Sequence, residues 1–341
     1  MFHLLHRSGY PIVLGLLVLA CSLVVPWSTS VAQELRLDPA LVKGPDTCGE
    51  CHEVSVNLWK QSHHFSTFKD MPRSDEARAI AKKMGIKRVK SESDCLTCHF
   101  TTAMDGGKAK PVAGITCESC HSAGAEWIDV HSDFGGKDVK AENEDPAHKV
   151  DRYKKSEAAG MIRPGNMYAV AENCYACHTV PNEKLVNVGG HPAGSKFELV
   201  AWTQGEVRHN AWYTESNDEA PIERRRLMYV VGKMLDLEYA YRGLAEATQK
   251  AKFAVSMAKR AKSASNALAK IAKVVDIAEV KSVVTLAGGI KLKLNNKDAY
   301  LKAANTVAEN AKKVAAMDGG SLAGIDALLP KSAKYKGTPA S

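Results

Sequence analysis

Eight of the nine cysteines in this 341-residue sequence form four pairs of identical spacing, and a histidine directly follows every pair. Two thiols three positions apart can form thioether bonds with the two vinyl groups of one haem, and the next histidine can bind the iron from the proximal side. We therefore predict four covalently bound c-type haems, numbered 1 to 4 in chain order. Their thioether residues are Cys48, Cys51, Cys95, Cys98, Cys117, Cys120, Cys174 and Cys177, and their proximal iron ligands are His52, His99, His121 and His178.

Zinc sites and disulfide bonds are the other common uses of paired cysteines. A structural zinc site uses pairs of this spacing, but it does not need a histidine at the fifth position of every pair. Disulfides form in oxidising compartments, but they also leave the histidines unexplained. With 12 histidines in the chain, four such coincidences would have a chance of about one in a million under this spacing rule. Haem attachment explains both residue types.

Each iron can take a sixth ligand on its distal face, and a neutral histidine held by packing suits that position. His64 lies on a predicted helix just after the first motif. A glycine pair before His191 allows the backbone to approach a porphyrin closely. The candidate distal ligands are His64, His131, His209 and His191, whereas His63 and His148 are expected to face solvent.

Over roughly residues 45–212 the sequence resembles the tetrahaem cytochrome c-554 family. The resemblance rests on the four motifs, on Trp59 and Ser62 before His64, and on His131 after the third motif. In that family three haems have two histidine ligands, and haem 2 has no sixth protein ligand. The family also packs its haems in close, stacked pairs, which implies fast electron transfer along the chain.

The resemblance further implies which histidines share an iron. By position it implies three pairs, which are His52 with His131, His121 with His64, and His178 with His209. Haem 2, with proximal His99, would be open. The spacing does not exclude His191 as its ligand, so both arrangements of haem 2 stay open at this point.

The composition is that of a soluble globular protein, with 45% hydrophobic and 25% charged residues but only 6% aromatics. Four porphyrins would supply the large apolar bodies that the sparse aromatics do not. The formal net charge of +8 falls close to neutrality once eight haem propionates are counted, so it does not indicate a polyanionic partner. Because no basic cluster with interleaved aromatics is present, we expect no nucleic-acid partner.

Residues 1–32 have the pattern of a secretory signal peptide. An uncharged run of 15 residues from Pro11 to Val25 precedes the small residues Ser30-Val31-Ala32. The run is shorter than the roughly 20 residues that span a bilayer. We predict cleavage near Ala32 and export to a bacterial periplasm, with Cys21 lost in the signal. The alternative is a lipoprotein in which Cys21 is lipidated.

We expect a mainly α-helical protein. A multihaem cytochrome c fold with little regular structure would surround the four haems, and a helical hairpin or bundle would follow. The predicted parts are the signal peptide 1–32, the tetrahaem domain 33–215, the α-helical C-terminal domain 216–320 and a flexible tail 321–341. The short loop 99–117 makes haems 2 and 3 neighbours, and the polar region 135–165 is expected to be a solvated surface excursion.

From Pro221 onward the sequence contains neither Cys nor His, and apolar residues recur at helical spacing. The periodic segments run from Leu227 to Tyr241, from Phe253 to Val275 and from Tyr300 to Val314. They predict a helical hairpin or a three-helix cap on the haem domain. Because alanine-rich faces permit close helix approach, a dimerisation or partner-docking module is the alternative.

Three functions fit these features. The favoured one is a non-enzymatic electron carrier between periplasmic or membrane-bound redox proteins, since six-coordinate iron has no free position for a substrate. The second is a reductase or oxidase of a small nitrogen or sulfur compound at a five-coordinate haem 2, with proton donors nearby. Candidate donors are Arg163, Tyr168 and Arg208. The third is a subunit of a larger multihaem complex, attached through its C-terminal helices.

Overall fold

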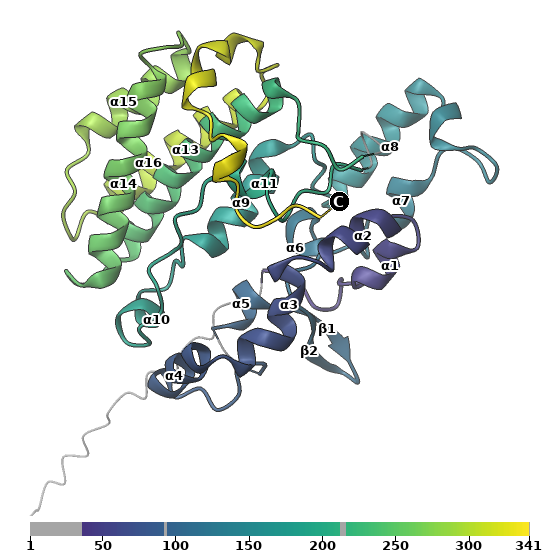
Figure 1. The fold of residues 1–341 in the computed structure, drawn as a ribbon, viewed down its shortest axis with the longest axis horizontal. Helices are drawn as coiled ribbons and strands as arrows, with labels where there is room; N and C mark the ends of the chain where they lie inside the picture. The colour runs from purple at the N-terminus through teal and green to yellow at the C-terminus, as the bar shows by residue number, and fades with distance from the viewer. Residues whose placement is uncertain (1–35, 92–93, 212–215, 341) are drawn as a thin grey trace, which may run out of the picture. The chain divides into compact units, whose positions relative to one another are not determined.

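The computed structural model describes residues 36–91, 94–211 and 216–340 (Figure 1). The predicted signal peptide, its cleavage position near Ala32 and Cys21 all lie outside these residues. The protein is mainly α-helical, which confirms the predicted fold class. Within the described residues, no helix is both long enough and apolar enough to cross a membrane.

Short helices and loops make up the chain as far as the second motif. They are α1 (Pro45–Gly49), α2 (Glu53–Trp59), α3 (His63–Asp70), η1 (Met71–Arg73), α4 (Asp75–Met84) and α5 (Leu96–His99). Serine begins two of these helices, because the hydroxyl oxygens of Ser62 and Ser74 accept hydrogen bonds from the backbone N–H groups of Phe65 and Ala77. The first and second motifs lie on α1 and α5 and on the residues directly beside them.

A β-hairpin joins the second motif to the third, where a loop was expected. Strand β1 (Thr101–Asp105) pairs antiparallel with β2 (Lys108–Ala113). Its two turn residues, Gly106 and Gly107, have φ of +59° and +77°, a conformation that glycine adopts without steric cost and that matches the twist of a hairpin. The strands are short and mix polar with apolar residues, so the sequence contains little periodic signal for them.

The third and fourth motifs lie on α6 (Glu118–His121) and α9 (Met167–His178). The other elements of this part are α7 (Ile128–Ser132), η2 (Ala141–Asn143), α8 (Pro146–Ala158), α10 (Glu183–Asn187) and α11 (Leu199–Thr203). Helix α8 lies inside the region expected to be a surface excursion. The helix begins at Pro146 for two reasons. The Asp145 carboxylate accepts hydrogen bonds from the N–H groups of Ala147 and His148, and proline is favoured in the first turn of a helix.

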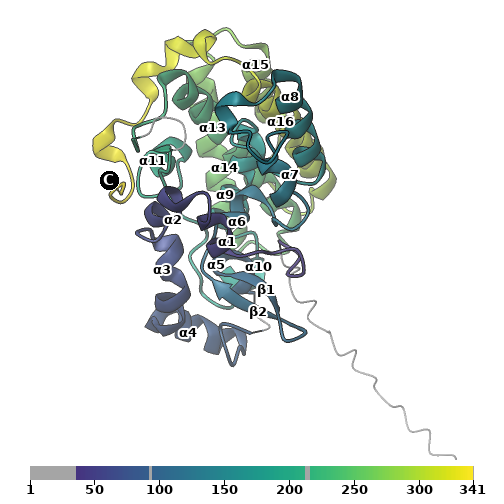
Figure 2. The same cartoon turned by 90° about the vertical axis from the view of Figure 1, so that its right-hand side faces the viewer.

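The C-terminal part contains four long helices where a hairpin or three helices were predicted. They are α13 (Ile222–Glu246), α14 (Lys252–Ile271), α15 (Ala278–Gly289) and α16 (Lys297–Ala315). The second predicted segment corresponds to α14, and α15 is an additional helix, because the chain leaves the helical conformation after Ile271 and resumes it at Ala278. Both views show α14 and α16 running alongside α13 (Figures 1 and 2).

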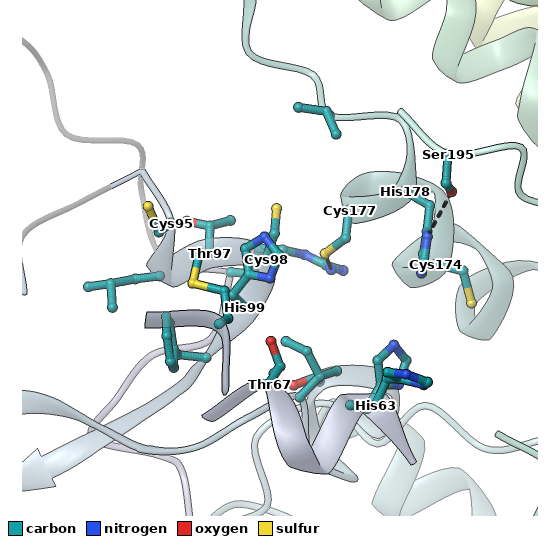
Figure 3. A pocket seen from close by; sticks show the side chains of 18 of the residues that line it. His63, Thr67, Cys95, Thr97, Cys98, His99, Cys174, Cys177, His178 and Ser195 are labelled. Carbon is teal, nitrogen blue, oxygen red and sulfur yellow. Dashed lines mark hydrogen bonds between the residues drawn. The ribbon is translucent and has the colours of Figure 1, made fainter. Parts of the chain in front are cut away.

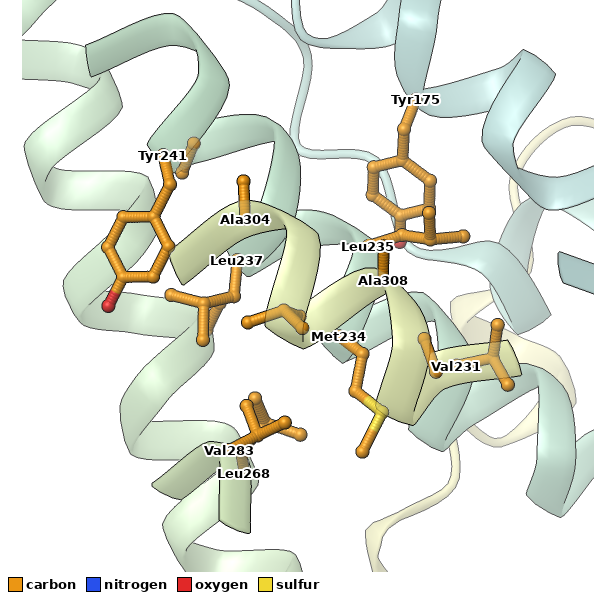
Figure 4. Close-up of a cluster of buried hydrophobic side chains, with 14 of the residues drawn as sticks. Tyr175, Val231, Met234, Leu235, Leu237, Tyr241, Leu268, Val283, Ala304 and Ala308 are labelled. Atoms are coloured by element: carbon orange, nitrogen blue, oxygen red, sulfur yellow. The ribbon is translucent and has the colours of Figure 1, made fainter. Parts of the chain in front are cut away.

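The largest hydrophobic core surrounds α13 and includes side chains of α14, α15 and α16 (Figure 4). Tyr241 of α13 stacks on Tyr300 of α16, with ring centroids 6.0 Å apart. At Gly232, α13 comes so close to the haem-motif region that an added Cβ would lie 3.0 Å from Leu199 and 3.1 Å from the Tyr175 hydroxyl. Helix α9, which carries the fourth motif, therefore packs directly on the C-terminal helices.

Residues 321–340, predicted to be a flexible tail, are folded onto the rest of the protein. They continue η3 (Gly320–Leu328) and include η4 (Ser332–Lys334). Leu322 and Ile325 are fully buried. The small residues and prolines of this segment led to the prediction of a flexible tail, but its few large apolar residues pack into the core.

Candidate haem sites

Every motif histidine has one further histidine ring beside it, drawn from a distant part of the chain. The separations between ring centroids are 6.2 Å for His52 and His131, 6.4 Å for His99 and His191, 6.4 Å for His121 and His209, and 6.3 Å for His178 and His64. The structure thus brings together all four proximal and all four distal candidates.

These separations fit two imidazoles on opposite sides of one metal ion. A metal–imidazole bond is about 2 Å long and a ring nitrogen lies about 1 Å from its centroid, so two axial rings have centroids about 6 Å apart. Two nitrogen donors per pair are the axial set of a haem iron. They are the wrong set for structural zinc, which takes four protein ligands.

The pairs differ from those that the resemblance implied in three of four cases. Only His131 faces the expected partner, His52. His64 faces His178 instead of His121, and His209 faces His121 instead of His178. The histidine beside His99 is His191. The reason is that position along the chain does not determine which loop reaches which face of a distant motif.

Most of these imidazoles are held in one tautomer by a hydrogen bond at Nδ1. Nδ1 faces a backbone carbonyl oxygen in His121 (Ile162, 2.8 Å), His131 (Ile128, 2.5 Å), His191 (Pro192, 2.8 Å) and His209 (Val207, 2.8 Å). A carbonyl only accepts, so Nδ1 carries the proton and Nε2 is left free for a metal. In His178 the partner of Nδ1 is the Ser195 hydroxyl, at 3.1 Å.

Burial favours the neutral form of several of these rings, as metal ligation requires. It lowers the pKa of His99 and of His178 to about 4, with the neighbouring imidazoles adding to the shift. The pKa of His64 is also lowered, mainly by burial. Two of the sparse aromatic residues pack on His178, Phe197 at 4.5 Å and Trp202 at 4.9 Å between ring centroids.

Residues of the second and fourth motifs line one cavity of about 550 Å³. In the close view, Cys95, Cys98 and His99 lie across from Cys177 and His178 (Figure 3). His64 and His191 also line this cavity. The space lies between both members of two histidine pairs, which is where flat apolar groups bound to these motifs would lie.

Sulfur contacts show which motifs are neighbours. The thiols of Cys48 and Cys117 lie close enough to shift each other's pKa, and so do those of Cys98 and Cys177. The first motif is therefore beside the third, and the second beside the fourth. Thr101, which follows the second motif, and Ser119, inside the third, have their hydroxyls 3.1 Å apart in a hydrogen bond.

Glu118, inside the third motif, is a buried residue whose role the sequence did not indicate. Its carboxylate accepts hydrogen bonds from the backbone N–H groups of Lys43 (2.9 Å), Gly44 (2.8 Å) and Gly124 (2.7 Å). Residues 43–44 directly precede α1 and the first motif, so one side chain fastens the first motif to the third. No periodicity or spacing distinguishes this glutamate from an exposed one.

A second buried cluster lies beside His131. Arg152 donates hydrogen bonds to both carboxylate oxygens of Glu144 and, at 2.5 Å, to the carbonyl oxygen of His131. These bonds, together with one from His148, lower the pKa of Glu144 to about 2. His148, expected to face solvent, is thus half-buried at 2.8 Å from Glu144, whereas His63 is exposed as predicted.

The candidate proton donors do not line the cavity at His99. Arg163, Tyr168 and Arg208 are absent from the described residues that form its lining. Arg163 packs over the Tyr153 ring at 3.7 Å. The Tyr168 hydroxyl donates a 2.9 Å hydrogen bond to Glu238 of α13. Both side chains are engaged in packing the protein.

Comparison with known proteins finds similarity to one family. Residues 47–122 match the family model described as cytochrome c554 and c-prime. The chain is 27% identical over 248 residues to cytochrome c-554 of Nitrosomonas europaea, an alignment that covers 70% of this chain and 93% of that protein. No solved structure matches the chain significantly. Both similarities agree with the motif and ring geometry, and they support the resemblance of this chain to the cytochrome c-554 family of multihaem c-type cytochromes.

Proposed function

We propose that this protein is a periplasmic electron carrier with four covalently bound haems, each held by two histidines. The observation that carries the proposal is the set of four histidine pairs with centroids 6.2 to 6.4 Å apart. The proposed ligand pairs are His52 and His131, His99 and His191, His121 and His209, and His178 and His64. When bound, the haems supply one-electron oxidation and reduction.

The protein's own residues hold and orient these ligands. The cysteine pairs anchor each group through thioethers. Hydrogen bonds from Nδ1 to backbone carbonyls keep Nε2 directed at the iron and raise the basicity of the ligand. Burial of the rings limits access of water and, with the axial ligands, sets the reduction potential. Because the first motif lies beside the third and the second beside the fourth, the bound groups would lie close enough for electron exchange.

The closed ligand sets support a carrier over an enzyme. A reductase or oxidase needs one coordination position for its substrate, together with positioned proton donors. His191 faces the one motif histidine for which the family resemblance implies an open iron. Export to the periplasm is supported by the signal-like residues 1–32, and the partners we propose are periplasmic or membrane-bound redox proteins.

Spectroscopy of the purified protein tests this function. We expect an intact mass with four haems per chain, and an electron paramagnetic resonance (EPR) spectrum of the ferric protein with only low-spin signals. Reduced protein should pass electrons to an artificial acceptor without consuming nitrite or hydroxylamine. A mass matching the haem-free chain would overturn the haem assignment. Turnover of nitrite or hydroxylamine well above the rate of free haem would overturn the carrier function.

A further inference from the structure

We propose that α14 is a ligand-positioning element for haems 2 and 4, and that Arg260 is its positioning residue for the proximal ligand His178. The inference rests on the proposed function, because it concerns the axial histidines of bound haems. The sequence assigned the C-terminal helices only a capping or docking role. The structure instead connects α14 to the segment 183–195, which contains one distal histidine and contacts one proximal histidine.

The first connection is at the start of α14. The Asn187 side-chain oxygen accepts a 2.9 Å hydrogen bond from the backbone N–H of Phe253 and so caps the helix. The neighbouring Lys252 donates a 3.1 Å hydrogen bond to the carbonyl oxygen of His191. The backbone that holds the distal candidate of haem 2 is therefore bound to the first turn of α14 at two points, Asn187 at the end of α10 and His191 itself.

The second connection is two turns further along α14, at Arg260. Its guanidinium donates a 2.8 Å hydrogen bond to the carbonyl oxygen of Ser195 and forms a 2.5 Å ion pair with Asp236 of α13. Ser195 in turn contacts His178 twice. Its N–H donates to the His178 carbonyl at 3.0 Å, and its hydroxyl is 3.1 Å from Nδ1 of the His178 ring. Arg260 thus determines where the hydroxyl that orients His178 lies.

Close packing at Gly194 leaves this connection little freedom. Gly194 has φ of +82°, and an added Cβ would lie 2.6 Å from the Arg260 guanidinium and 2.9 Å from the His178 carbonyl oxygen. A side chain at this position would push apart the two groups that the loop joins. The segment is held between α14 and the fourth motif, with no space for a looser arrangement.

The pair of charges also gives α14 an electrostatic effect on haem 4. The side chains of Arg260 and Asp236 are only 12% and 16% exposed, so water screens them weakly. A nearby positive charge favours the ferrous state of an iron, and a nearby negative charge favours the ferric state. Loss of the Arg260 charge should therefore lower the potential of haem 4, whereas loss of the Asp236 charge should raise it.

The test compares Arg260→Met and Asp236→Asn in the full-length haem-loaded protein. Spectroelectrochemical titration follows the four reduction steps, and the ferric EPR spectrum follows the spin state. The His64→Ala variant identifies haem 4 as the haem that leaves the low-spin spectrum. We expect the haem 4 step to shift downward in Arg260→Met and upward in Asp236→Asn, and to return most of the way in Arg260→Lys.

The matched control is Arg226→Met, which removes a two-point ion pair with Asp326 elsewhere among the C-terminal helices. It should lower thermal stability without moving any potential. For the haem 2 connection, Asn187→Ala should produce a high-spin fraction in the ferric protein without any added ligand. Arg226→Met should produce no high-spin fraction.

Shifts of the haem 4 step in the same direction for both charge variants, or no shift in either, would overturn the role of Arg260. These outcomes are distinguishable from failure of the proposed function. The haem count and spin state of the unaltered protein are measured first, and they decide the proposed function independently of the variants.

Discussion

The imidazole rings of His99 and His191 face each other with centroids 6.4 Å apart. This relationship changes the interpretation of the second motif. The family resemblance implies an open iron there, which would suit a reaction with a small molecule. A histidine on the other side is the arrangement that the proposed carrier function requires at this motif.

Substitution of His191 tests this directly. His191→Ala should convert one haem of four to a high-spin form, because its iron loses the distal ligand. The measurements are the ferric EPR spectrum and cyanide binding, which should rise from none to about one equivalent. The control is His148→Ala, since this histidine contacts Glu144 and not a motif histidine. An unchanged low-spin spectrum in His191→Ala would show that His191 is not the ligand.

Glu118→Gln should destabilise the protein. The substitution removes a buried charge that accepts three backbone hydrogen bonds, and hydrogen bonds to charged groups contribute about 1.5–3 kcal/mol each. We expect a loss of at least about 2 kcal/mol in the free energy of unfolding, measured by denaturant titration of the haem-loaded protein. The exposed Glu126 offers the matched change, Glu126→Gln, which should stay within about 0.5 kcal/mol. Equal stability of the two variants would contradict the fastening role of Glu118.

Glu144 predicts an acid-sensitive region around His131. Its pKa in the folded protein is about 2, below the ordinary value of 4.5, so the folded state binds fewer protons than the unfolded state between these values. The stabilisation is complete above about pH 4.5 and is lost as the pH falls toward 2.

Unfolding measured between pH 6 and pH 3 should therefore show a steeper loss of stability in the unaltered protein than in Glu144→Gln. Because Arg152 also binds the His131 carbonyl, the low-spin signal of haem 1 should weaken first in acid. Parallel pH profiles for the two proteins would argue against this cluster as the cause.

The C-terminal segment should stabilise the backbone that leads to His209. Lys336 exchanges backbone hydrogen bonds with Ala201 and Glu206, each of 2.9 Å. Truncation before Tyr335 removes both bonds, and we expect a lower melting temperature and a high-spin fraction at haem 3. Lys334→Ala, an exposed change in the same segment, should leave both properties unaltered. A truncated protein with a fully low-spin spectrum would contradict the prediction.

The sequence by itself determined the chemistry of the motifs and the helical character of the C-terminal part. Haem attachment depends on residues within five consecutive positions, and helices depend on periodic apolar residues such as those from Leu227 to Tyr241. Both are local patterns, so they can be recognised without knowledge of the fold. Family resemblance added one histidine pair whose rings face each other in the structure, His52 with His131.

Only the tertiary structure decided which histidines face each other, how Glu118 joins two motifs, and that α14 supports the segment around His191. These relationships join residues far apart in the chain, such as His64 and His178 or Arg260 and Ser195. Irregular loops without periodicity bring them together, and their paths depend on the packing of the whole protein. Spacing along the sequence places no restriction on such contacts, and so the ligand pairs could not be derived from it.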